Sequence, residues 1–142
     1  MTKIQKGINI LIAIFLIAAV VQVSEAKIAT VSKVKITAIN FDAYGKDTTS
    51  NVNGEWVKIH NSGTKSQQMV SWALIDRGNK HVYTFPSFTL NPGKTVTVYT
   101  GKGKNSATSL FMQRGWHIWN NGGDTATLID NKGKIISQMS GP

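Results

Sequence analysis

The feature that most constrains this sequence is a series of short apolar groups that begins at residue 34 and continues almost to the end of the chain. Valine, isoleucine, threonine and aromatic residues dominate these groups, and polar or glycine-containing segments separate them. Short groups of this composition at regular spacing are typical of an all-β sandwich or barrel. The predicted strands cover residues 34–41, 55–60, 72–75, 81–85, 96–99, 116–119, 126–129 and 134–139.

Alternation within a group predicts which face of its strand is buried. In residues 94–99, Val96 and Val98 fall on one face, and Thr95, Thr97 and Tyr99 fall on the other. Residues 56–59 and 116–119 instead carry apolar groups on both faces. That pattern suits a central strand or an aromatic side chain exposed for recognition, and the sequence leaves both interpretations open.

Turn residues indicate how the strands connect. Pro92 and Gly93 fit a type II turn, which needs a φ near −65° and then a positive φ. Segments 76–79 and 130–133 are compact, glycine-containing hairpin connections. We therefore predict an antiparallel meander.

The N-terminal segment has the layout of a secretory signal peptide. Lys3 and Lys6 precede an apolar run over residues 8–23, and Ser24 and Ala26 are small residues before a cleavage point after Ala26. The run is shorter than the roughly 20 residues that a membrane-spanning helix needs, which favours cleavage, with an uncleaved anchor as the alternative. Either outcome predicts an extracytoplasmic protein, secreted or associated with the cell surface.

The remaining chain, residues 27–142, is predicted to form one domain. Removing two lysines and Glu25 lowers the basic count from 16 to 14 and the acidic count from 7 to 6, which leaves a formal charge of +8. The sequence has no cysteine, so packing alone must stabilise the fold. The positive charge suggests an anionic polymer, nucleic acid or acidic glycan, as one class of partner.

Two polar segments, residues 42–54 and 101–109, are too long for tight turns and are predicted binding loops on a β scaffold. Lys102 and Lys104 lie in a glycine-rich stretch that could hold phosphates, although scattered lysines also serve solubility. Trp56 and Trp72 are expected to be structural. Amide and imidazole groups flank the other two tryptophans, which suits stacking on a sugar or base. The predicted partner-binding residues are Lys102, Lys104, Asn105, Trp116, His117, Trp119 and Asn120.

Evidence for metal binding or catalysis is weak. The first long loop carries oxygen ligands that calcium accepts, with Asp42, Asp47 and Glu55 as weak candidates, but the spacing is not that of an EF-hand. No metal or cofactor is therefore predicted. The three histidines fall on separate predicted strands, where surface or strand-edge positions are expected: His60, His81 and His117.

The sequence contains no catalytic constellation, since no nucleophile has a base at a characteristic spacing. Asp124 follows a glycine-rich loop, and we expect its carboxylate to accept backbone N–H bonds. The sequence predicts that the protein is not an enzyme.

Four ordered segments carry a family resemblance. They read EWVKIHNSG at 55–63, SWAL at 71–74, FPSFTLNPG at 85–93 and WNNGGDTATLID at 119–130. Together they resemble the lamin tail domain of the prokaryotic type over residues 34–139. The resemblance implies an immunoglobulin-like β-sandwich that acts as an exported, non-catalytic binding or structural module at the cell surface, without the coiled-coil rod of nuclear lamins. The alternative function is an anionic-polymer binder.

Overall fold

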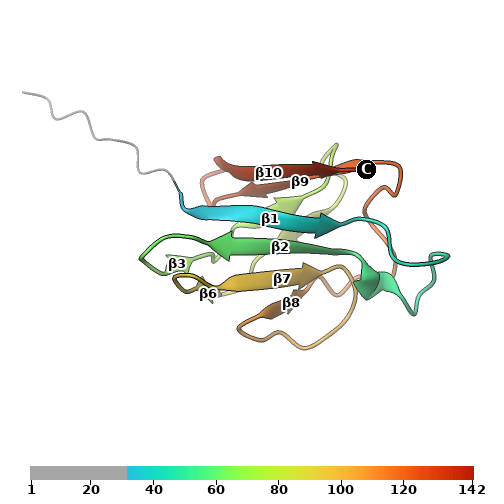
Figure 1. Cartoon of the computed structure of the whole chain (residues 1–142), viewed down its shortest axis with the longest axis horizontal. Helices are drawn as coiled ribbons and strands as arrows, with labels where there is room; N and C mark the ends of the chain where they lie inside the picture. Colours follow the sequence, from blue (N-terminus) through green and yellow to red (C-terminus); the bar gives the residue numbers. More distant parts are fainter. Residues whose placement is uncertain (1–31) are drawn as a thin grey trace, which may run out of the picture. The chain divides into compact units, whose positions relative to one another are not determined.

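The computed structural model describes residues 32–142, which form a sandwich of two four-stranded sheets (Figure 1). The first sheet has the order β1-β2-β7-β8, the second has the order β10-β9-β4-β5, and β3 and β6 form a small third sheet. The predicted signal peptide, residues 1–26, lies outside the described residues. The elements are β1 (Val34–Asn40), the 3-10 helix η1 (Val52–Gly54), β2 (Trp56–Asn61), β3 (Gln67–Gln68), β4 (Ala73–Ile75), β5 (Val82–Thr84), β6 (Thr89–Leu90), β7 (Thr95–Tyr99), β8 (Ser109–Phe111), β9 (Asp124–Ile129) and β10 (Ile135–Gly141).

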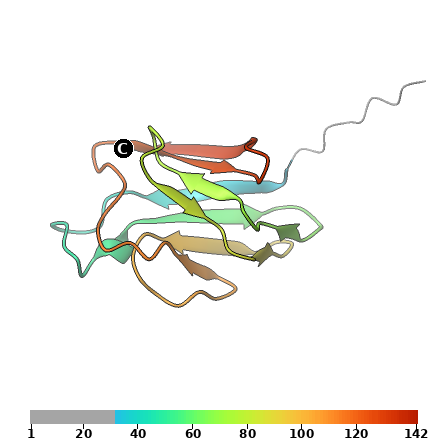
Figure 2. The same ribbon diagram turned by 180° about the vertical axis from the view of Figure 1, so that it is seen from behind.

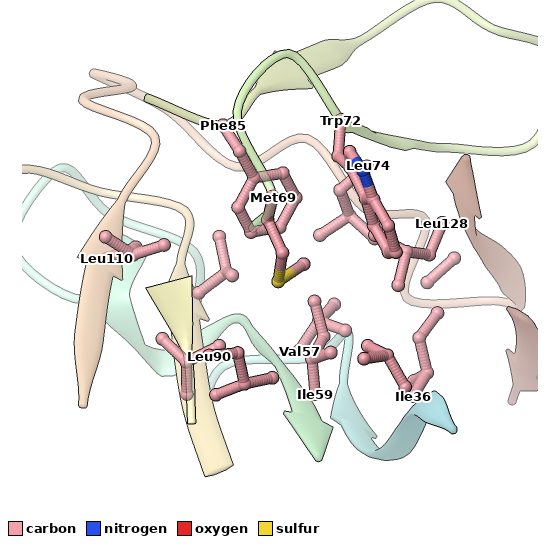
Figure 3. Packing of buried hydrophobic residues seen from close by; sticks show 14 of the residues in the cluster. Ile36, Val57, Ile59, Met69, Trp72, Leu74, Phe85, Leu90, Leu110 and Leu128 are labelled. Carbon is pink, nitrogen blue, oxygen red and sulfur yellow. The ribbon is translucent and has the colours of Figure 1, made fainter. Parts of the chain in front are cut away.

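The core lies between the two sheets, as the alternating strands predict. In β7, Val96 and Val98 are fully buried, and Val57 and Ile59 of the neighbouring β2 face the same side. Side chains from the second sheet and from the connections meet them, as Figure 3 shows for Met69, Trp72, Leu74, Phe85 and Leu128. Each large apolar side chain buried in this way contributes about 1.5–3 kcal/mol to stability.

The two sheets also approach each other along one edge. The backbone N–H of Ile36 in β1 donates to Ser137 Oγ in β10 over 3.0 Å, so these strands of different sheets run side by side. Figure 2 shows the molecule from the opposite side, where the β4–β5 hairpin lies nearest the viewer and the first sheet lies behind it. The all-β, immunoglobulin-like sandwich predicted from the sequence is confirmed.

The meander and one strand were predicted wrongly. Strands β7 and β8 pair in parallel, and the sheet orders place non-consecutive strands together. Residues 116–119 form no strand, because Trp119 is buried from a loop by stacking on Phe41 and Trp116 is exposed. Strands β3, β6 and β8 are additional to the prediction. The hairpins at 76–81 and 130–134 and the positive φ of Gly93 agree with the turn chemistry.

The strands run between two ends of the sandwich, which Figure 1 shows at its right and left. We call the first the loop end. It contains the connections 41–55, 76–81, 100–102 and 112–123 and the first residue of β9, Asp124. The opposite end contains the start of β1 and the turns 62–66, 91–94 and 130–134.

Candidate functional site

The loop that follows β1 is held in one shape by two asparagines. Asn40 Nδ2 donates to the carbonyl oxygens of Asp42 and Gly54, at 3.0 and 2.7 Å, and so closes the neck of the loop. Inside the loop, Asn51 Oδ1 accepts the backbone N–H of Thr48 at 2.9 Å, and its Nδ2 donates to two further carbonyl groups. These two side chains therefore satisfy several backbone groups of the loop and fix its shape.

His117 holds the connection 112–123 against this loop. Its Nε2 lies 3.2 Å from the carbonyl oxygen of Thr48 and 3.1 Å from Asn51 Oδ1. Its Nδ1 lies 3.3 Å from Glu55 Oε1 and 3.8 Å from Asp47 Oδ1. Only 4% of the side chain is exposed, so the surface position predicted for His117 is wrong. Since oxygen acceptors face both ring nitrogens, a doubly protonated ring can donate on both sides.

Glu55 is the buried carboxylate beside His117. The residue is fully buried, and its Oε2 accepts the backbone N–H of Ile118 at 3.1 Å. Burial raises the pKa of the Glu55 carboxyl, while the Ile118 hydrogen bond and the charge of His117 oppose that rise. The carboxylate therefore ties two loops together.

Trp119 belongs to the core. Its ring stacks on Phe41 with centroids 4.6 Å apart, and its Nε1 donates to Thr100 Oγ1 over 3.2 Å. The residue is buried, so its ring face is used by packing and is closed to a ligand. Trp119 is therefore not part of the candidate surface.

Trp116 and Tyr44 are the exposed aromatic residues of the loop end. Trp116 is 53% exposed, and its ring stands edge-on to the imidazole of His117, with centroids 5.6 Å apart. Tyr44 is fully exposed in the first loop, where its carbonyl oxygen accepts a bond from Asn51. Sequence reasoning missed Tyr44, although a lone aromatic residue beside a glycine in a polar loop was the available signal.

The predicted basic loop borders the same end. Asn53 Nδ2 donates to the carbonyl oxygen of Lys102 over 2.9 Å, and the side chains of Lys102 and Lys104 are exposed. Asn105 has a structural contact, because its Oδ1 accepts the backbone N–H of Phe111 at 3.0 Å. The structure thus brings Lys102 to the first loop and uses Asn105 to shape the second.

The Gly-rich segment before β9 is organised by Asp124. Its carboxylate accepts the backbone N–H groups of Arg77, Asn120 and Thr125 at 2.9, 3.0 and 2.7 Å, as expected for this residue. Asn120 Oδ1 in turn accepts the N–H of Gly122, so the predicted binding residue Asn120 takes part in turn formation. A shallow polar hollow adjoins this segment, lined by Asp76, Arg77, Lys80, His81, Ile118, Asn120, Gly123 and Asp124.

The calcium candidates contact Asn121 and His117. Asn121 Nδ2 donates to Asp42 Oδ1 at 2.8 Å and to Asp47 Oδ2 at 3.5 Å, and Asp47 Oδ1 and Glu55 Oε1 face His117. Within residues 32–142, no group of three or more histidine or carboxylate side chains is arranged to hold a metal ion. The other two histidines lie elsewhere, His60 beside Thr95 on the first sheet and His81 beside Asp76.

The Lamin Tail Domain family model matches residues 28–141, which is most of the chain and includes every strand described above. The chain belongs to the lamin tail domain family. A search of curated proteins found no match. Lamin tail domains are non-catalytic, immunoglobulin-like modules, and the sandwich described here has that architecture. No helix in residues 32–142 is long and apolar enough to span a membrane.

Proposed function

We propose that this lamin tail domain is an exported, non-catalytic binding module that holds a macromolecular partner, a protein or surface polymer, at the cell surface through its loop end. The observation that carries the proposal is the position of Trp116. Trp116 is 53% exposed, and its ring packs in a T-shaped contact against the buried imidazole of His117. His117 in turn contacts Thr48 and Asn51 of the first loop. Large aromatic side chains on fixed supports are typical anchors of binding interfaces.

The support beneath Trp116 is pre-organised. His117 joins the first loop to the connection 112–123, and Glu55 joins that connection to the start of β2. A partner that contacts this end therefore pays little entropy to order the loops, which favours affinity. Tyr44 adds a second exposed ring on the first loop.

The charge of the loop end is balanced, which directs the choice of partner. Five carboxylate residues lie there, and so do five basic residues. The carboxylates belong to Asp42, Asp47, Glu55, Asp76 and Asp124, and the basic residues are Lys46, Arg77, Lys80, Lys102 and Arg114. We infer that aromatic and polar contacts select the partner at this end more than net charge does.

The experiment places a photo-crosslinking residue at the anchor. Trp116→p-benzoylphenylalanine in the full chain, produced in cells that export it, should give a discrete covalent adduct on irradiation. The matched control is Gln138→p-benzoylphenylalanine, at an exposed position on β10. Adding Tyr44→Ala should weaken the adduct at position 116 while thermal unfolding stays unchanged. Equal adducts at both positions, or none at position 116, would contradict the proposal.

An anionic-polymer function is the second candidate, supported by the exposed Lys102 and Lys104. Its test is a fluorescence titration with single-stranded DNA and with an acidic polysaccharide at low and high salt. A lysine-based site predicts binding at low salt that Lys102→Gln with Lys104→Gln weakens and that salt abolishes. Absence of binding at low salt would remove this candidate.

A further inference from the structure

The carboxylate residues of the sandwich are concentrated at one of its two ends, whereas basic residues lie at both. Of the six carboxylate residues within 32–142, five lie at the loop end and Asp130 alone lies at the opposite end. That opposite end carries five lysines, and we call it the basic end. They are Lys33, Lys65, Lys94, Lys132 and Lys134, and all five are exposed.

Strand pairing gathers these lysines on one surface. Val34 pairs with Asn61, which places Lys33 beside the turn after β2, and the N–H of Ser62 donates to the carbonyl oxygen of Lys33 over 3.0 Å. Asn61 connects the next two, since its Nδ2 donates to the carbonyl oxygen of Lys65 and its N–H to that of Lys94. Two of these lysines therefore have their carbonyl groups bound by one buried asparagine, and the third has its carbonyl bound by the next residue, Ser62.

The hairpin between β9 and β10 extends the same surface. Because Ile36 of β1 bonds to Ser137 of β10, the start of β10 lies next to the start of β1. Lys132 and Lys134 lie in this hairpin, and the left side of Figure 1 shows the hairpin and the start of β1 at the same end. Ile135 adds an apolar side chain that is 56% exposed.

These lysines are available to an external anion. The salt bridges found in residues 32–142 all involve histidine, so none of the five ammonium groups is paired with a carboxylate there. Asp130 is the one acid nearby, and its Oδ1 accepts the backbone N–H groups of Lys132 and Lys134 at 2.8 and 2.9 Å. The net charge of the basic end is therefore five minus one, or +4.

We propose that the basic end docks on the surface of an anionic lipid bilayer. The chain enters the sandwich at this end, and the apolar run at residues 8–23 lies only ten residues before Lys33. Ten residues span at most about 35 Å, so while that run is uncleaved and in a membrane Lys33 stays within about 35 Å of the bilayer. A lysine cluster beside an apolar segment is the pattern that attracts anionic headgroups, and an exposed Ile135 among the lysines suits insertion at their level.

Docking in this way leaves the loop end facing away from the bilayer. The strands of the sandwich run from one end to the other, so the surface that carries Trp116 points outward when the lysines contact lipid. The inference goes beyond the proposed partner binding and does not depend on it. Contacts of this kind fall off within a Debye length, about 8 Å at physiological salt.

The experiment compares two variants of the full chain that have equal net charge. Lys33→Gln, Lys65→Gln and Lys94→Gln remove three of the five lysine charges of the basic end, and Lys46→Gln, Lys80→Gln and Lys102→Gln remove three exposed lysine charges of the loop end. Vesicle co-sedimentation is measured with phosphatidylcholine alone and with about one third phosphatidylglycerol. The readout is the ratio of the partition coefficients for the two vesicles, which cancels the contribution of the apolar run.

Each lysine near an anionic surface strengthens binding roughly fivefold. The ratio of partition coefficients should therefore be about tenfold to 100-fold lower for the basic-end variant than for the unmodified chain. The loop-end variant should lose less than about threefold. Equal losses in both variants, or a ratio near one for the unmodified chain, would overturn the proposal. Lysine-dependent binding to single-stranded DNA without vesicle binding would also overturn it. Photo-crosslinking at position 116 is read separately, so failure of the partner hypothesis leaves the vesicle result intact.

Discussion

His117 Nδ1 lies 3.3 Å from Glu55 Oε1 in the interior of the loop end, and neither atom has a well-formed hydrogen bond in the structure. The two residues are distant in sequence, but both connect the first loop, residues 41–55, with the connection 112–123. Glu55 directly precedes β2 and accepts the N–H of Ile118, and His117 lies in the connection 112–123, next to Trp116. A buried acid beside a buried imidazole makes the stability of this end sensitive to protonation.

The first prediction concerns the pH dependence of Glu55→Gln. Burial raises the pKa of the Glu55 carboxyl above its usual value near 4.5, so the folded chain keeps a proton that the unfolded chain loses first. The stability from that proton is fully present below pH 4.5 and is lost as the pH rises through the raised pKa. Glutamine does not titrate, so the destabilisation caused by the exchange should shrink as pH rises through this window. Urea unfolding of both proteins from about pH 4 to 7 measures the difference in unfolding free energy, and a constant or widening gap would contradict the assignment.

The second prediction separates packing from hydrogen bonding at Trp119. Trp119→Phe keeps a ring on Phe41 but removes the donor to Thr100, which should cost about 1–2 kcal/mol. Trp119→Ala removes both and should cost about 3–5 kcal/mol. The exposed Trp116→Ala should change the unfolding free energy by less than about 1 kcal/mol. Equilibrium denaturation gives all three values, and equal costs at positions 116 and 119 would show that our division into core and surface is wrong.

The third prediction concerns the close approach at Gly54. A Cβ at this position would lie 2.6 Å from Ala43 Cβ, so Gly54→Ala should shift the first loop and destabilise the fold by about 1–3 kcal/mol. Gly115→Ala is the matched control, because a Cβ there meets open space. Thermal unfolding should separate the two variants by several degrees. Coincident melting curves would mean that the loop is looser than its hydrogen bonds indicate.

The sequence predicted the parts of the fold whose residues alternate. Strand β7 follows the alternation of Val96 and Val98, and the hairpin before β10 follows its turn residues. Two-residue strands such as β3 and β6 are too short for any period to be detected. The parallel pairing of β7 with β8 depends on a connection that doubles back, and nothing local in the sequence specifies that path.

The candidate site was predicted by composition but not by geometry. The apolar pair Trp116 and Trp119 indicated burial or recognition, and the structure assigns one role to each residue. Residues 116–119 were wrongly predicted as a strand, because apolar composition indicates that a segment is buried but not which backbone conformation buries it. Trp119 is buried by stacking on Phe41 although its backbone is in a loop. The contact between Ile118 and Glu55 joins residues 63 positions apart, which only the fold brings together.

The last prediction concerns Asn61, around which the basic end is built. Its side chain is buried, its Nδ2 donates to the carbonyl oxygens of Lys65 and Leu90, and its Oδ1 accepts the N–H of Gly63, each at 2.9 Å. Asn61→Ala leaves the buried carbonyl of Leu90 without this donor, so the unfolding free energy should fall by about 2–3 kcal/mol. Asn91→Ala removes only an exposed contact with Ser66 and should cost less than about 1 kcal/mol.

Urea unfolding compares the two variants, and vesicle binding adds a second readout. If Asn61 positions the lysines, Asn61→Ala should also weaken binding to anionic vesicles at a temperature where the variant remains folded, because the turns that carry Lys65 and Lys94 lose their common anchor. A variant that is destabilised but binds these vesicles as the unmodified chain does would show that the lysines act as independent charges. In that case the basic end attracts the bilayer by its total charge, and the arrangement around Asn61 serves stability alone.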